Sequence, residues 1–154
     1  MRLPLSTTLP SESGRARAAQ NMIESLPQVD ILIVDDDGDV RDLLGLLLQS
    51  RGAVVRTATS AAEALDVIAR QPPDVLLADV GMPEEDGYSL IRKVRAHEQR
   101  HNGVRLPAIA VTAYATSADR EQAIAEGYDW HIPKPVDPQA LARAIFKVAK
   151  PQEA

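Results

Sequence analysis

Acidic side chains follow two short apolar runs of the sequence. The run 31–34 is followed by Asp35 and Asp36, and the run 75–78 is followed by Asp79. Short apolar runs bounded by turn-forming residues are typical of buried strands. If both strands lie in one parallel sheet, their carboxyl ends meet at the edge where ligands bind in open α/β proteins. We therefore expect these three carboxylates to lie close together.

Three neighbouring carboxylates predict a cation site. Their charges repel unless one group is protonated or a cation lies among them. Mg²⁺ prefers oxygen ligands and binds through few carboxylates together with waters and phosphate oxygens. We expect Mg²⁺ on Asp36 and Asp79, with Asp35 in support. An aspartate in such a site can act as the nucleophile of a phosphoryl transfer.

Two further predicted strands end in groups that bind phosphoryl oxygens. The run 107–111 is followed by Thr112, and the run 130–132 is followed by Pro133 and Lys134. A hydroxyl and an ammonium group at the same sheet edge donate hydrogen bonds to a phosphoryl group. Four strand ends therefore point to one phosphoryl-transfer site.

The order of these residues resembles the receiver domain of two-component response regulators over about residues 29–149. The segments 110–115 and 131–138 are most similar to the receivers of hybrid histidine kinases. The matching positions are Asp35, Asp36, Asp79, Met82-Pro83, Asp86-Gly87, Thr112-Ala113 and Lys134-Pro135. The resemblance implies that Asp79 is the phosphoacceptor and that the backbone carbonyl of Gly81 is a further Mg²⁺ ligand. It also implies a cis Lys134–Pro135 peptide bond, which is essentially a proline feature.

The resemblance also implies a switch between the unmodified and phosphorylated states. Thr112 would bind a phosphoryl oxygen and move inward, with His131 in the place of the rotating tyrosine or phenylalanine of the family. The alternative for His131 is a half-buried histidine whose ring nitrogens are hydrogen bonded.

The function implied by the resemblance is phosphorelay signalling. Asp79 would accept a phosphoryl group from the phosphohistidine of a histidine kinase or a histidine phosphotransfer domain, and partner binding would change in response. A second copy of the chain is a further implied partner, through the fourth helix, fifth strand and fifth helix. Such a chain modifies itself and is no conventional enzyme. It would be a cytoplasmic single-domain regulator or the carboxy-terminal receiver of a hybrid sensor kinase.

Gly81 bears on the lifetime of the phosphorylated state. In receivers the side chain two residues after the phosphoacceptor helps to orient the hydrolytic water, and glycine has none. With bulky Tyr114 two residues after Thr112, the sequence predicts slow self-dephosphorylation, because the water is poorly positioned.

Two other functional classes remain open. A haloacid-dehalogenase-type phosphatase also uses an aspartyl phosphate, Mg²⁺, a hydroxyl and a lysine, with its nucleophile in the first aspartate cluster. A flavodoxin-like cofactor-binding module shares the fold, and fold alone does not decide function. Turnover of a phosphomonoester would favour the first, and a yellow purified protein the second.

The elements that must position these residues alternate between strand and helix. Helical patterns are expected at 39–51, 61–70, 88–97 and 117–126, with a last helix from Asp137-Pro138. Asp39 is the expected cap of the first helix, and Ser60 with Glu63 predicts a capping box. This alternation predicts an α/β flavodoxin-like (βα)5 fold, a doubly wound parallel sheet with strand order 2-1-3-4-5. We expect a flexible tail or linker at 1–28, one receiver domain at 29–150 and a short tail at 151–154.

Composition narrows the functional classes further. The chain has 154 residues, 45% of them hydrophobic, a formal net charge of -5 and no cysteine. Disulfides and thiolate metal sites are excluded. An acidic chain without a basic patch is a poor partner for nucleic acid. No apolar run approaches the roughly 20 residues of a membrane span, so no membrane insertion of this chain is expected.

Overall fold

The computed structural model describes residues 26–82, 85–101, 103–113 and 116–149. Most of the two predicted tails, and Tyr114, lie outside these ranges. Within them, strands and helices alternate along the chain. The strands are β1 (Asp30–Val34), β2 (Val54–Ala58), β3 (Val75–Asp79), β4 (Ala108–Thr112) and β5 (Trp130–Pro133). The helices are α3 (Gly38–Gln49), α4 (Ala61–Arg70), α5 (Gly87–Arg100), α6 (Ser117–Glu126) and α7 (Pro138–Ala149).

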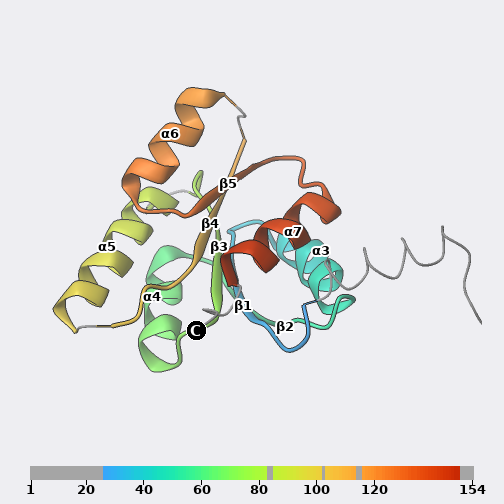
Figure 1. The fold of residues 1–154 in the computed structure, drawn as a ribbon, viewed down its shortest axis with the longest axis horizontal. Coiled ribbons are helices and arrows are strands. Elements are labelled where there is room, and N and C mark those ends of the chain that lie inside the picture. The colour runs from blue at the N-terminus through green and yellow to red at the C-terminus, as the bar shows by residue number, and fades with distance from the viewer. Residues whose placement is uncertain (1–25, 83–84, 102, 114–115, 150–154) are drawn as a thin grey trace, which may run out of the picture.

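All five strands are parallel and lie in the order β2-β1-β3-β4-β5. This order confirms the predicted doubly wound, flavodoxin-like fold. Helices α4, α5 and α6 cover one face of the sheet, and α3 and α7 cover the other (Figure 1). Because the strands are parallel, the residues that follow β1, β3, β4 and β5 meet at one edge.

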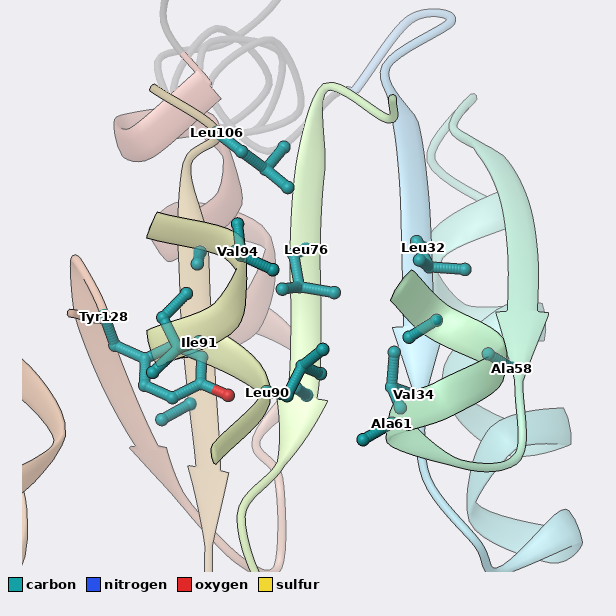
Figure 2. Packing of buried hydrophobic residues seen from close by; sticks show 14 of the residues in the cluster. Leu32, Val34, Ala58, Ala61, Leu76, Leu90, Ile91, Val94, Leu106 and Tyr128 are labelled. Carbon is teal, nitrogen blue, oxygen red and sulfur yellow. The ribbon is translucent and has the colours of Figure 1, made fainter. Parts of the chain in front are cut away.

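Alternate residues of the strands supply two separate cores. Leu32, Leu76 and Ala110 face α4, α5 and α6, whereas Ile33 and Leu77 face α3 and α7. Figure 2 shows the first core, in which side chains of α5 lie against the middle of the sheet. Central strands buried on both faces are typical of parallel sheets, and each fully buried leucine or isoleucine contributes roughly 1.5–3 kcal/mol. Packing on both faces therefore holds the central strands in place, and these strands position the residues that meet at the carboxyl edge of the sheet.

Polar side chains fix where helices α3 and α4 begin. The carboxylate of Asp37 accepts hydrogen bonds from the amides of Asp39 (2.9 Å) and Val40 (3.3 Å) and caps α3. The prediction that Asp39 is the cap was therefore wrong by two residues. Ser60 caps α4 as predicted, but the Glu63 carboxylate accepts from the amide and hydroxyl of Thr59, so the capping box is not closed on Ser60.

Several boundaries differ from those that the sequence predicts, and the helix expected at 39–51 is observed as Gly38–Gln49. The core already includes Leu26, which is fully buried and donates its amide proton to the Arg51 carbonyl at 2.8 Å. Leu26 lies three residues before the predicted start of the domain. Helix α5 continues to Arg100, three residues beyond the end at residue 97 that the sequence predicts. Among the described residues, no helix combines the length and apolar character needed to cross a membrane.

Candidate functional site

Asp79 is the last residue of β3 and lies at the centre of the edge. It pairs in register with Val111, so Thr112 is one step further along the neighbouring strand. Asp79 is only 8% exposed, and its Oδ1 accepts the Gly81 amide at 3.0 Å. Gly81 itself is exposed in the turn after β3. The Gly81 amide thus holds one carboxylate oxygen of Asp79, and the other, Oδ2, lies near Lys134.

The residues after β1 bring two more carboxylates to the same place. Asp35 is 2% exposed and accepts the Asp37 amide at 2.9 Å, and Arg41 donates to the Asp35 carbonyl at 2.6 Å. Asp36 is exposed. One carboxylate oxygen from each of Asp35, Asp36 and Asp79 lies within 4.8 Å of the others. The structure therefore brings together the three aspartates that the sequence singled out.

Lys134 bridges two of these carboxylates. Its Nζ lies 3.3 Å from Asp79 Oδ2 and 3.6 Å from Asp35 Oδ2. The amide of Lys134 donates to the Thr112 carbonyl at 2.7 Å, which ties the ends of β4 and β5 together. The Lys134–Pro135 peptide bond is cis. The hydrogen bond from the Lys134 amide to β4 holds the backbone from which the ammonium group reaches the site.

The electrostatics of the site leave an excess of negative charge. Burial raises the pKa of Asp35, and the neighbouring Asp79 charge adds to this, although the Asp37 amide and Lys134 act in the opposite direction. Burial alone would lower the pKa of Lys134, but the charges and hydrogen bonds of Asp79 and Asp35 outweigh it and raise that pKa. Two of the three neighbouring carboxylates, Asp35 and Asp79, thus share the Lys134 ammonium group, and the third, Asp36, lies beside them and is exposed. A hard divalent cation such as Mg²⁺ fits this donor set.

Thr112 and His131 are in direct contact. The Thr112 hydroxyl oxygen and His131 Nε2 are 2.7 Å apart, at hydrogen-bond distance. Thr112 is 3% exposed and His131 is half-buried. The structure therefore pairs the two residues predicted to form the switch, and it also gives the histidine nitrogen the polar partner that the alternative reading requires.

Tyr128 and Gly87 support the site, and only Gly87 was singled out from the sequence. The Tyr128 hydroxyl is buried and donates to the Gly87 carbonyl at 2.7 Å. Gly87 packs so tightly that an added Cβ would lie 2.7 Å from Val80 Cα and 2.8 Å from the Asp79 carbonyl. Gly87 belonged to the family pattern, but an isolated tyrosine gives no sequence signal of this kind. The Tyr128 bond fastens the start of α5 to the segment before β5, and the close packing of Gly87 holds that start against the end of β3.

A cavity of about 960 Å³ lies away from these residues, between α4, α5 and the segment before β4. Pro73 and Leu106, which line it, precede β3 and β4, so the cavity is at the opposite edge of the sheet. His97 and His101 also line it, and their rings stack with centroids 4.2 Å apart. The cavity contains none of the predicted site residues.

Comparison with known proteins agrees with the geometry. The family model of the response regulator receiver domain matches residues 31–146. An uncharacterized 14.6 kDa protein in the sodA1 3' region of Leptolyngbya boryana is 47% identical over 123 residues, which cover 80% of this chain and 92% of that protein. The sensor histidine kinase RcsC of Salmonella typhi is 33% identical over 146 residues, which cover 95% of this chain but 14% of RcsC.

A solved structure of the same family is also similar to this chain. The crystal structure of a putative response regulator from Chloroflexus aurantiacus superposes with a TM-score of 0.73 at 34% identity, covering 82% of this chain and all of that one. These matches do not support a haloacid-dehalogenase-type phosphatase or a flavodoxin-like cofactor binder. With the family model spanning most of the chain and the acidic edge in place, the chain belongs to the response regulator receiver domain family and functions in two-component phosphorelay signalling.

Proposed function

We propose that Asp79 is the residue of this receiver domain that accepts a phosphoryl group, from the phosphohistidine of a histidine kinase or a histidine phosphotransfer domain. The observation that carries the proposal is the position of Lys134 Nζ, 3.3 Å from Asp79 Oδ2, beside a cluster of three carboxylates. The Lys134 ammonium group can therefore pair with the oxygens of a phosphoryl group that approaches Asp79. Lys134 Nζ lies closer to Asp79 Oδ2 than to Asp35 Oδ2, at 3.3 Å against 3.6 Å, and this supports Asp79 as the acceptor.

The transfer exchanges one bond to phosphorus for another. An Asp79 oxygen attacks the phosphorus atom, the phosphorus–nitrogen bond of the phosphohistidine breaks, and the imidazole nitrogen keeps the electron pair. Lys134 and Thr112 hold the phosphoryl oxygens during this displacement. Asp36, Asp79 and the Gly81 carbonyl would hold Mg²⁺, with Asp35 in support, and the ion would neutralise charge on the phosphoryl oxygens. The chain in this proposal catalyses its own modification.

The phosphorylated state would differ from the unmodified state in charge and in contacts. An aspartyl phosphate attracts Lys134 and Thr112, and both residues are attached to the ends of β4 and β5. The surface of α6, β5 and α7 would then shift between two populations with different affinity for partners. Exposed apolar side chains on this surface, Ile124, Trp130 and Phe146, support a second copy of the chain as one such partner.

The relatives support two cellular contexts for this chain. A chain that matches 14% of a sensor histidine kinase is consistent with the receiver of a hybrid kinase, and one that matches 92% of a 14.6 kDa protein is consistent with a single-domain regulator. In both cases we expect the domain to act in the cytoplasm, where its phosphodonor would be found.

Intact mass spectrometry after incubation with acetyl phosphate tests this function. The wild-type chain should gain one phosphoryl group when Mg²⁺ is present and none when a chelator replaces it. Asp79→Asn is the matched control, because it removes the nucleophile and keeps the shape of the side chain. An Asp79→Asn protein that gains the same mass, or a wild-type protein that never does, would refute the assignment.

A further inference from the structure

A cavity at the edge where the strands of the sheet begin takes no part in the site around Asp79. Its volume is about 960 Å³, and it is lined by the second halves of α4 and α5, the turn before β3 and the segment before β4. Small-molecule sites in proteins are clefts of about 300–1,000 Å³ with a mostly apolar lining and a few polar groups. The size of this cavity is therefore that of a site for a small molecule.

Apolar side chains form most of the lining, and packing holds several of them in place. Val94 is 4% exposed and Leu106 is 7% exposed, and both belong to the first core. Figure 2 shows them toward the start of β3. Pro73 is buried, and Leu65 and Ile68 of α4 are half-buried. An apolar ligand would meet a surface that is already formed, and removal of its own apolar surface from water would favour binding.

The three carboxylates of the lining already have partners. Asp66 forms an ion pair of 3.2 Å one turn further along α4, and Asp74 Oδ2 accepts the amide of the first residue of β1 at 2.8 Å. Glu98 accepts the Leu106 amide at 2.7 Å and forms an ion pair of 3.0 Å with Arg95. None of these carboxylates therefore needs a cation from a ligand.

The cationic side chains of the lining differ in this respect. Lys93 Nζ lies 2.6 Å from a Glu85 oxygen, and an Arg105 nitrogen lies 2.9 Å from an Asp129 oxygen. Arg100 is exposed at the last position of α5 and forms no ion pair with any residue that the structure describes. A guanidinium group binds an oxyanion through two parallel hydrogen bonds. The charge available to a ligand in this cavity is thus positive.

The histidines at the end of α5 favour an aromatic body for the ligand. His97 and His101 line the cavity, and both are exposed. Their rings stack with centroids 4.2 Å apart. Aromatic rings pack well against other flat rings, either offset and parallel or edge to face. The cavity thus offers aromatic contacts in the same helical turn as the Arg100 guanidinium.

We propose that the cavity between α4 and α5 binds a small organic anion with an aromatic body, its anionic group on Arg100 and its rings against the apolar lining. The apolar lining favours the body of such a ligand, and Arg100 distinguishes it from a neutral hydrophobic molecule. None of the described residues that line the cavity belongs to the acidic edge. The ligand and a phosphoryl group on Asp79 can therefore be bound at the same time, and binding does not depend on phosphoryl transfer.

Two probes that differ in one group test the proposal on the full chain. They are 8-anilinonaphthalene-1-sulfonate and N-phenyl-1-naphthylamine, which has the same rings without the sulfonate. Probe fluorescence should show one saturable site for each. Arg100→Gln should weaken binding of the sulfonate by about two- to fivefold, the effect of an exposed ion pair, and leave the neutral probe unchanged. Arg143→Gln is the matched control, because Arg143 is an exposed arginine of α7 on the other face of the sheet, and it should change neither affinity.

A third variant tests whether the probes bind in the cavity. Ala69 lines it from α4 and is exposed, so Ala69→Phe should fold, as urea unfolding would verify, and should weaken both probes by partly filling the space. The proposal would be overturned by a wild type without a saturable site, or by undiminished binding of both probes to Ala69→Phe. Equal sulfonate affinity of Arg100→Gln and Arg143→Gln would overturn it too, as would an equal loss of both probes in Arg100→Gln.

Discussion

Asp35 is the residue whose environment in the site is least favourable to its charge. It is buried beside Asp79, and its pKa is raised by burial first and by the Asp79 charge as well. A carboxyl group whose pKa is higher in the folded than in the unfolded chain binds its proton more tightly when folded. Its contribution to stability therefore falls as the pH rises from the unfolded value, about 3.9, through the raised folded value.

Replacement of Asp35 by asparagine should stabilise the metal-free protein at neutral pH, because the amide has no charge to desolvate. The stability difference between Asp35→Asn and wild type should be small near pH 4, grow as the pH rises and level off above the raised pKa. Urea unfolding in the presence of a chelator measures it. With saturating Mg²⁺ the wild type should be the more stable of the two proteins, because it retains the carboxylate that supports the Mg²⁺ site. A variant less stable than wild type at neutral pH without metal would contradict this explanation.

Gly81 leaves room beside Asp79, the proposed phosphoacceptor. A Cβ at this position would meet Asp79 Oδ1 at 3.6 Å, an ordinary contact, so a side chain can be added without strain. Gly81→Asn should shorten the lifetime of the aspartyl phosphate several-fold, because the new amide can orient the hydrolytic water. Decay of the phosphorylated mass after donor removal gives the rate. Gly81→Ala is the control, because it adds the same Cβ without a polar group. Equal lifetimes of the aspartyl phosphate in the wild type, Gly81→Ala and Gly81→Asn would contradict a role of this side chain in orienting the water.

At the scale of elements, the start of α5 is anchored by one buried hydrogen bond. Tyr128 donates its hydroxyl to Gly87, and burial raises the pKa of this hydroxyl far above its ordinary value. Tyr128→Phe leaves the Gly87 carbonyl without this donor and should lower the free energy of unfolding by about 1–3 kcal/mol. Tyr88→Phe is the matched control on a half-buried tyrosine and should change it by less than about 0.5 kcal/mol. Equal effects of the two changes in urea unfolding would argue against the anchor.

The sequence predicts the elements well where their ends carry a chemical signal. Helices α4 and α6 begin and end at the predicted residues, because Ser60 caps the first and Gly127 closes the second. The extent of α5 was missed, because a polar stretch such as 97–100 can continue a helix on its exposed face. The choice of Asp37 over Asp39 as cap depends on backbone angles that neighbouring aspartates do not reveal.

At the scale of the whole molecule, the sheet explains why the site could be predicted. The three aspartates, Thr112 and Lys134 each follow or end a strand, so parallel pairing alone brings them to one edge. Contacts that depend on register and packing could not be predicted in the same way. The bond from Tyr128 to Gly87 is of this kind, and the pairing of Thr112 with His131 was implied only by the resemblance.

The central claim is that four strand ends form one phosphoryl site with Asp79 as its acceptor. A crystal structure of the chain with Mg²⁺ and beryllofluoride tests it most directly. We predict beryllium bonded to an Asp79 oxygen, fluorines in contact with Lys134 and Thr112, and Mg²⁺ held by Asp36, Asp79 and the Gly81 carbonyl. Beryllium on another carboxylate, or Lys134 turned away from Asp79 in the complex, would contradict the claim.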